Sequence, residues 1–328
     1  MSELMHPYLQ SLKIDGKEIN LSTVEVFTYM EAADLSGPSI ILSLLDEYSI
    51  IRDDVGLKAG SEVTCELASF LDDTVEAFTE TFTVAVHPIN NGVITIEAMQ
   101  KDCFELKQPA GKPQFFVNKT PEDILKALLP TLDVDCQASS EVTYHLNSGT
   151  LPTMLIRQMA RDHGAACWIA RGTVYFVPYK KLAGQSGYLK YGKNSPDADV
   201  EIYGSSVINN QSHYERTTQK HWMSQSLDKG LITASEYADK EIVMLPQMGQ
   251  SQLDNQSVYL QPKLDIELLG RGELMPTMAL DVEFVKFNSN SEVDESIEST
   301  LIVHHVSHYQ RGKHYLTRAI LGVVNNGE

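Results

Sequence analysis

The spacing of apolar residues changes twice along this sequence of 328 residues, and this change constrains the fold more than any other feature. Up to residue 107, short β-branched and apolar runs alternate with polar residues at the period of a half-buried strand. Over residues 108–190 the spacing becomes that of amphipathic helices, and from residue 191 it returns to that of strands. We therefore expect a mainly β protein with an α+β insert.

The first segment predicts short strands joined by tight turns. The Asp15-Gly16 pair is a strong signal for a two-residue hairpin, and Asn90-Asn91-Gly92 marks a second turn. Strands at such regular spacing are typical of a β-barrel or a β-sandwich. The expected strands are residues 24–29, 39–45, 61–67, 80–86 and 92–98, after a hairpin over residues 12–19.

The middle segment predicts two helices and a hairpin. Thr120 and Pro121 are residue types preferred at the N-cap and at the first helical position, and Pro130 ends that helix. A second helix is expected over residues 152–162, followed by Gly164 as a C-terminal glycine. The two strands of the predicted hairpin are residues 166–169 and 173–177, on either side of Arg171-Gly172.

The third segment predicts strands again, with one irregular region. Residues 205–262 are polar and rich in glutamine, so we expect long loops or one poorly defined helix there. The expected strands are residues 280–285, 299–306 and 315–323, with a turn at Arg311-Gly312.

The net charge follows the same division. Residues 1–107 hold 19 acidic and 6 basic side chains, residues 108–190 hold 6 and 9, and residues 191–328 hold 19 and 11. The three net charges are −13, +3 and −8, within a total of −18. A Pro- and Gly-rich stretch at 108–113 and a flexible stretch with two glycines at 182–187 have the composition of linkers.

These observations predict three domains. They are a first β-barrel domain over residues 1–107, a small α+β domain over 108–190, and a second β-barrel domain over 191–328 with the polar insertion at about 205–262. The acidity excludes a protein that binds nucleic acid in a basic groove, and one held to an anionic membrane surface.

The sequence contains no membrane-spanning run and no secretion signal. No stretch approaches 18 consecutive apolar residues, and the N-terminus lacks a basic start followed by an apolar run. Cys65, Cys103, Cys136 and Cys167 lie far apart without a CxxC pair, which favours buried reduced thiols. We therefore expect synthesis in a bacterial cytoplasm and no contact with a membrane.

His304, His305 and His308, with His314 nearby, are the strongest metal-ligand candidates. On a regular strand His304 and His308 share a face while His305 points away, so at most two of these three could converge. The segment also lacks the glutamate of the helical HExxH zinc motif. We therefore interpret these residues as ordinary strand histidines, either hydrogen-bonded or exposed, and expect no metal site.

Other candidates for catalysis have simpler structural interpretations. Asp53-Asp54 and Asp72-Asp73 could be imagined as the carboxylates of a glycoside hydrolase, but adjacent acidic residues usually mark turns. Cys167 lies near His163, yet its apolar neighbours favour a core thiol over a nucleophile. Phosphate-binding glycine motifs are absent from the sequence. We expect no catalytic residues and no cofactor.

Residues 155–178, with the sequence LIRQMARDHGAACWIARGTVYFVP, resemble the helix–glycine–hairpin signature of phage tail baseplate hub proteins. These are the late-control-D group, which shares its base with the spike proteins of type VI secretion. Residues 15–67 and 82–102 are similar to the first barrel of that family, and residues 271–321 to its second. The resemblance implies two tube-like β-barrel domains flanking a small α+β domain.

The resemblance also implies an assembly. Hub proteins of this kind form a threefold ring whose subunits each contribute two barrels, so that a sixfold tail tube is matched to a threefold spike. The implied partners are two further copies of the chain, tail tube or tube-initiator proteins above, and a separate central spike protein below. Baseplate wedge or sheath-proximal proteins and the tape measure protein are further candidates, with DNA only in transit. The implied location is the tail baseplate of a virion.

The sequence thus predicts a structural hub rather than an enzyme. The acidic excess of the outer segments suggests a negatively charged channel that repels DNA phosphates. Two alternatives remain open at this point: a tail-associated peptidoglycan hydrolase, and the base of a type VI secretion spike or a module that carries cargo.

Overall fold

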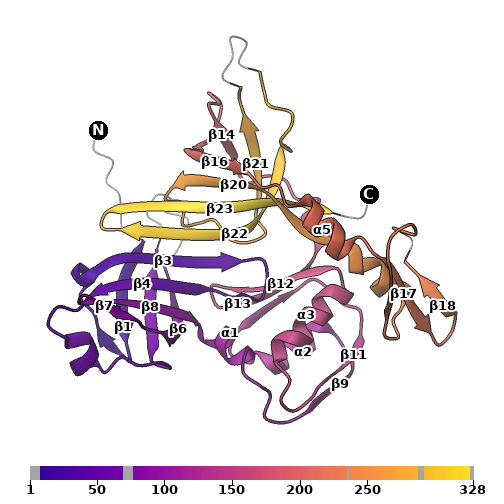
Figure 1. Cartoon of the computed structure of the whole chain (residues 1–328), viewed down its shortest axis with the longest axis horizontal. Helices are drawn as coiled ribbons and strands as arrows, with labels where there is room; N and C mark the ends of the chain where they lie inside the picture. Colours follow the sequence, from indigo (N-terminus) through magenta and orange to yellow (C-terminus); the bar gives the residue numbers. More distant parts are fainter. Residues whose placement is uncertain (1–7, 69–76, 235, 287–291, 326–328) are drawn as a thin grey trace.

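A computed structural model of the chain describes residues 8–68, 77–234, 236–286 and 292–325. Strands hold far more of these residues than helices do, and the helices concentrate in the middle of the chain (Figure 1). The mainly β fold with an α+β part that the sequence predicts is confirmed.

The first segment forms antiparallel strands in the spatial order β3-β4-β8-β6-β5-β1-β2. Asp15 and Gly16 both have positive φ, 47° and 78°, as a tight turn between twisted strands requires. The elements are β1 (Leu9–Ile14), β2 (Lys17–Glu18), η1 (Leu21–Thr23), β3 (Val24–Ala32), β4 (Ser39–Leu45), η2 (Ile50–Val55), β5 (Glu62–Leu67), β6 (Phe78–Val86), β7 (Ile89–Asn90) and β8 (Val93–Gln100).

The predicted strands of this segment are confirmed, because alternate residues point into one apolar core. Phe27, Leu42, Val63, Phe82 and Ile96 are fully buried in it. The π-helical turn η2 and the helix that follows β8 were not predicted.

The middle segment is the α+β part. Thr120 caps α2 by accepting a hydrogen bond from the Asp123 backbone N–H, with Pro121 at the first helical position, as predicted. The elements are α1 (Lys101–Leu106), β9 (Gln114–Lys119), α2 (Pro121–Leu128), β10 (Asp133–Cys136), β11 (Val142–Leu146), α3 (Pro152–Asp162), β12 (Ala165–Ala170), β13 (Thr173–Pro178) and α4 (Tyr179–Leu182).

Two small sheets and two helices surround the core of this segment. The sheet β10-β13-β12 combines the predicted hairpin with a parallel strand, and β9 pairs with β11 separately. Ile124 of α2 and Ile156 of α3 are fully buried in the core, as are Ile169 and Phe176 from the hairpin.

The third segment contains long antiparallel strands, and the prediction for residues 205–262 is wrong. That region forms a sheet in the order β18-β17-β19, preceded by one helix and followed by another (Figure 1). The elements are β14 (Lys190–Lys193), β15 (Val200–Glu201), β16 (Gly204–Val207), α5 (Gln211–Thr218), β17 (His221–Ser226), β18 (Gly230–Thr233), β19 (Ile242–Leu245), α6 (Gln250–Asp254), η3 (Asn255–Ser257), β20 (Tyr259–Leu269), β21 (Ala279–Phe284), β22 (Thr300–Arg311) and β23 (His314–Asn325).

This difference arises because the region has its own small apolar core, whose few residues are separated by polar, glutamine-rich sequence. Leu253 is fully buried and Ile232 and Ala234 nearly so, with Trp222 and Leu245 packed against them. Five widely spaced residues give no clear periodicity in the sequence, so the signal for a sheet was too weak to detect.

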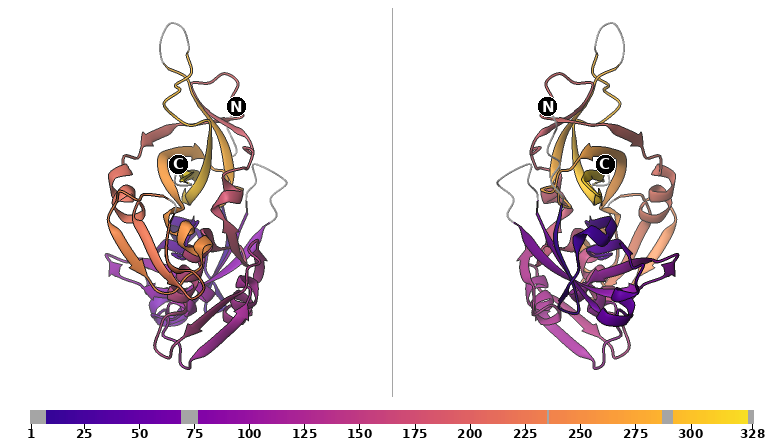
Figure 2. Two further views of the ribbon diagram at one scale, coloured as in Figure 1. Left: turned by 90° about the vertical axis from the view of Figure 1, so that its right-hand side faces the viewer. Right: turned by 90° about the vertical axis from the view of Figure 1, so that its left-hand side faces the viewer.

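Strand β22 joins the outer segments into one sheet. It pairs with β23 and β21 of its own segment and also with β3, where His305 lies opposite Ala32 and Gln310 opposite Phe27. Figure 2 shows this arrangement from both ends, with the indigo strands of the first segment below the yellow strands of the third. The three predicted domain ranges stay a proposal, but the outer segments contact each other through backbone hydrogen bonds.

A separate apolar cluster lies where all three segments meet. It contains Ala33 from the first segment, Trp168 from the middle segment, and Leu260 and Ile302 from the third. The Trp168 ring is 2% exposed and stacks on Tyr175 at a centroid distance of 4.8 Å. Among the described residues, no helix is long and apolar enough to span a membrane.

We predict that Trp168→Ala lowers the free energy of unfolding by about 3–5 kcal/mol, because it removes a large buried ring from this cluster. Chemical denaturation followed by circular dichroism measures the change. The control is Phe115→Ala, whose ring is 71% exposed, and which should change stability by less than about 0.5 kcal/mol. Equal stability of the two variants would contradict a structural role for the indole.

Candidate functional site

The histidines of β22 do not gather on one face of the strand. A β-bulge between Val303 and His305 inserts His304 as an extra residue, so His304 does not alternate in phase with His308. The prediction that these two share a face is therefore wrong. His308 is fully buried, with Nδ1 2.8 Å from the Tyr315 hydroxyl, and burial holds its pKa well below the ordinary value. Within the described part of the chain, no three His, Cys, Asp or Glu residues lie together as metal ligands.

The other sequence candidates do not converge either. Asp53 and Asp54 lie exposed on the π-helical turn, whereas Asp72-Asp73 lies outside the described residues. Cys167 is 4% exposed, and burial raises the pKa of its thiol, so a thiolate nucleophile is disfavoured there. His163 points its Nδ1 at the Met159 carbonyl oxygen, at 2.9 Å.

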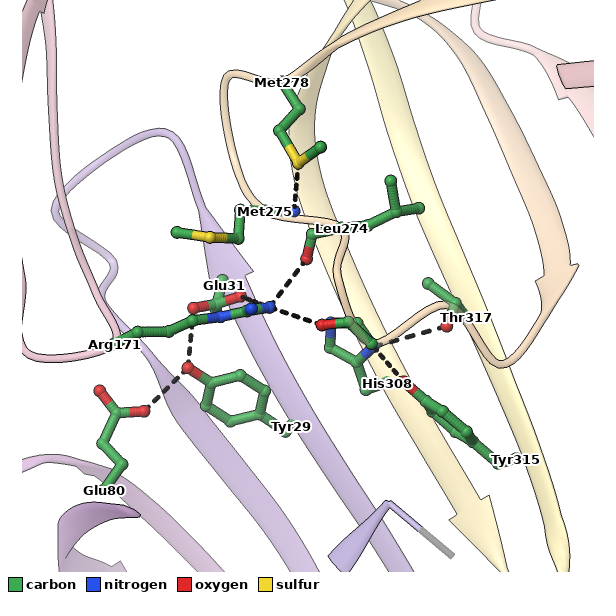
Figure 3. Close-up of polar contacts among 11 residues, drawn as sticks. Tyr29, Glu31, Glu80, Arg171, Leu274, Met275, Met278, His308, Tyr315 and Thr317 are labelled. Atoms are coloured by element: carbon green, nitrogen blue, oxygen red, sulfur yellow. Dashed lines mark hydrogen bonds and ion pairs between the residues drawn. The ribbon is translucent and has the colours of Figure 1, made fainter. Parts of the chain in front are cut away.

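The notable polar site of this structure is instead a junction of the three segments, centred on Arg171 (Figure 3). We call Tyr29, Glu31, Glu80, Arg171 and His308, with the carbonyl groups of Gly272 and Leu274, the Arg171 junction. Arg171 lies at the tip of the β12–β13 hairpin with φ of 48°, and its side chain is only 13% exposed. The tight turn therefore directs a cation from the middle segment into the space between the two outer segments.

Arg171 contacts both outer segments at once. Its Nη2 donates hydrogen bonds to the carbonyl oxygens of Gly272, at 2.8 Å, and Leu274, at 3.1 Å, in the third segment. The same nitrogen lies 3.6 Å from Glu31 Oε2 on β3, and the guanidinium carbon lies 4.8 Å from the centroid of the Phe78 ring. One side chain thus makes an ion pair, a cation–π contact and two hydrogen bonds to residues far apart in sequence.

Two buried carboxyl groups share the Tyr29 hydroxyl next to this guanidinium. Tyr29 Oη lies 2.8 Å from Glu31 Oε1 and 2.8 Å from Glu80 Oε2. Tyr29 and Glu31 are fully buried and Glu80 is 5% exposed. Burial raises the pKa of Glu80 to about 8, and the negative charge of Glu31 contributes to the rise.

An aromatic stack extends the junction toward β23. The Tyr8 ring stacks on His308 and on Tyr315, with centroid distances of 4.8 and 4.9 Å. The Leu9 backbone N–H donates to Gln310 Oε1 at 2.9 Å, so the start of β1 is held against β22. These contacts add apolar packing between the first and third segments around the buried charges.

A second polar contact joins the middle segment to the 205–262 region. Tyr144 donates a hydrogen bond to Asp162 Oδ2 at 2.5 Å, and Gln256 Nε2 donates to Asp162 Oδ1 at 3.3 Å. Gly164 has φ of 54°, and a Cβ there would lie 3.0 Å from the Asn255 side chain. An open cleft of about 850 Å³ lies beside these residues, lined mainly by amide and hydroxyl side chains.

The Arg171 junction has perturbed carboxyl groups, as many active sites do, but it is closed to substrates. A general acid must reach a bond of the substrate within hydrogen-bonding distance. Glu31 and Glu80 are buried among Tyr29, Arg171 and Phe78, so the junction can hold segments together rather than perform acid–base catalysis.

The buried carboxyl groups of this site were not predicted from the sequence, although a signal was present. Strand alternation places Glu31 on the same face as Phe27 and Tyr29, and Glu80 on the same face as Phe82. A charged residue on an inward-facing position requires a buried partner. What the sequence does not show is that the buried cation beside Glu31 is Arg171, 140 positions away along the chain, or that Glu80 shares the Tyr29 hydroxyl.

We predict that Arg171→Met lowers the free energy of unfolding by about 3–5 kcal/mol, because Glu31 then remains buried without a counterion. Adding Glu31→Gln to this variant should restore part of the loss, and a double-mutant cycle based on chemical denaturation measures the coupling.

The matched control is Arg318→Met. Arg318 pairs with Asp265 across exposed strands, and its side chain is 66% exposed. Its loss should lower stability by less than about 1 kcal/mol. If Arg171→Met were no more damaging than Arg318→Met, the buried pair would not hold the segments together.

No model of a known protein family matches the sequence, and no curated protein sequence matches it. Solved structures do match along almost the whole chain. A tail protein from Neisseria meningitidis has a TM-score of 0.64 at 13% identity, covering 97% of both chains. A 43 kDa prophage tail protein from Shewanella oneidensis has a TM-score of 0.62 at 11% identity, covering 96% of this chain and 97% of the other.

A protein of a secretion system is also similar. A component of the type VI secretion system of E. coli, described as structurally similar to the T4 bacteriophage tail proteins gp27 and gp5, has a TM-score of 0.56 at 10% identity. The match covers 96% of this chain and 77% of that one. The chain therefore has the fold of the Neisseria and Shewanella tail proteins, and this fold is shared with a component of type VI secretion.

Proposed function

We propose that this chain is the structural hub of a phage tail baseplate or of a tail-like particle, and that it has no catalytic residues of its own. The observation that carries this proposal is the match to a tail protein over 97% of both chains, together with the match to a prophage tail protein. Because the match extends over almost the whole chain, it covers both strand-rich segments and the α+β part between them. In this proposal the chain is a component of the virion, synthesised in the cytoplasm of the bacterial host.

The hub acts as a homotrimeric ring. Each chain supplies two strand-rich segments, so three chains provide six units around one axis, which matches a sixfold tail tube to a threefold spike. The continuous pairing of β3 with β22 supports this role, because it fixes the two strand-rich segments relative to each other. Tail tube proteins, a separate central spike, and wedge or sheath-proximal proteins are the partners of this ring.

The charge of the chain suits a conduit for DNA. With a net charge of −18 per chain, a ring of three copies is strongly acidic. Acidic residues that face the channel repel the DNA phosphates and prevent DNA from adhering during passage. DNA is therefore cargo in transit and not a bound ligand.

The base of a type VI secretion spike is a second candidate. It is supported by the match to the E. coli secretion component, whose TM-score and coverage of the matched chain are lower than those of the Neisseria and Shewanella tail proteins. Immunogold labelling distinguishes the two: a phage hub labels the tail end of purified particles, whereas a spike base requires an assembled secretion apparatus.

We predict that the purified chain forms a particle with three times its mass of 36.6 kDa. Multi-angle light scattering after size-exclusion chromatography measures this mass over a range of concentrations. A particle that stays monomeric at every concentration, and also in the presence of tail tube protein, would contradict the ring.

We further predict that an electron cryo-microscopy reconstruction of the assembled ring shows an acidic channel wall. The acidic excess of residues 1–107 and 191–328 is the basis of this expectation. A neutral or basic channel would contradict the proposed passage of DNA while leaving the ring itself intact.

A further inference from the structure

The hydrogen bonds of Tyr29 require one more proton than its hydroxyl carries. Tyr29 Oη lies 2.8 Å from an oxygen of Glu31 and 2.8 Å from an oxygen of Glu80. A phenol donates one hydrogen bond, and an ionised carboxylate can only accept. If both carboxyl groups were ionised, the single Tyr29 hydrogen could point at only one of them. The other carboxylate oxygen would then lie in contact with Tyr29 Oη without a hydrogen bond. One of the two carboxyl groups must therefore be protonated.

The positions of the charges identify the protonated group. Glu31 Oε2 lies 3.6 Å from Arg171 Nη2, and this cation favours an ionised Glu31. Burial raises the pKa of Glu31, but the charge of Arg171 and the hydrogen bond from Tyr29 oppose the rise. Glu80 has no ion-pair partner among the described residues, and burial together with the charge of Glu31 raises its pKa to about 8.

We propose that the Arg171 junction is a one-proton lock, which holds the three segments together most tightly while Glu80 is protonated and loosens when that proton is lost at mildly alkaline pH. The proton lies on Glu80 Oε2 and is donated to Tyr29 Oη. The Tyr29 O–H is then free to donate to Glu31 Oε1, and ionised Glu31 pairs with Arg171. This inference concerns the fold and does not rest on the proposed function.

Several other ionisable groups surround Glu80. They come from every element packed on the junction: Tyr29 and Glu31 on β3, Cys65 opposite Glu80 on β5, Asp102 on α1, Arg171 on the hairpin, and Tyr8, His308 and Tyr315 from the aromatic stack. Burial raises the pKa of the Cys65 thiol and of the three tyrosines, and lowers that of His308. These groups stay neutral and Arg171 stays charged, so Glu80 is the group that switches.

The direction of the pH dependence follows from linkage. The pKa of Glu80 is about 8 in the folded chain, above the value near 4.5 of a free glutamate. The unfolded chain therefore releases this proton first, and the stability from the lock is complete below about pH 4.5 and is lost as the pH rises through about 8. Above that pH, two buried carboxylates compete for one hydroxyl hydrogen and one cation.

The test compares the native chain with Glu80→Gln by chemical denaturation between pH 5 and pH 9.5. Glutamine keeps the shape of the protonated acid, and its amide N–H donates permanently to Tyr29 Oη. We expect the unfolding constant of the native chain to rise relative to that of the variant, by up to about tenfold per pH unit, and to level off above about pH 8. The two proteins should converge at acidic pH.

Two controls accompany this comparison. Glu66→Gln removes the same charge from an exposed position on β5 and should follow the native pH dependence. Glu31→Gln removes the counterion of Arg171 and should be destabilised at every pH, including pH 5. If Glu80→Gln showed the same pH dependence as Glu66→Gln, or were less stable than the native chain throughout, the proton lock would be refuted.

Infrared spectroscopy tests the proton directly and does not require the variant to fold. The native chain should show the carbonyl band of a protonated carboxylic acid at pH 7, and this band should disappear near pH 8. Its absence at pH 7 would overturn the proposal.

Discussion

The ion pair between Arg171 and Glu31 is the interaction on which the arrangement of the three segments depends. The hairpin that carries Arg171 belongs to the α+β part, whereas Glu31 lies on a strand of the first segment and the two carbonyl acceptors lie in the third. If any one segment moved away, Arg171 and at least one of its partners would lose a contact. The requirement that buried charges be paired therefore restricts how the segments can pack.

Such a pair contributes more to the uniqueness of the arrangement than to total stability. Removing two charges from water offsets much of their attraction, so an apolar cluster of the same shape could be as stable. The apolar cluster around Trp168 and the pairing of β3 with β22 supply the packing, and the Arg171 junction selects one arrangement among those that packing allows.

The turns, caps and strands could be predicted from neighbouring residues, whereas the Arg171 junction could not. The Asp15-Gly16 turn, the Thr120 cap and the strand alternation around Phe82 each depend on neighbouring residues, and the structure confirms these predictions. The small sheet within residues 205–262 was missed because its core is only a few residues wide. The bulge at His304 and the pairing of Arg171 with Glu31 arise from contacts between distant segments, which spacing along one sequence does not encode.

Hydrogen exchange measured by mass spectrometry on the native chain and on Arg171→Met tests most directly whether one side chain unites the three segments. The account predicts that amides of β3, of the β12–β13 hairpin and of residues 272–274 lose protection together in the variant. The β9–β11 pair, which contributes no residue to the junction, should keep its protection. Loss of protection confined to the hairpin tip would contradict the account, because the outer segments would then be held together without Arg171.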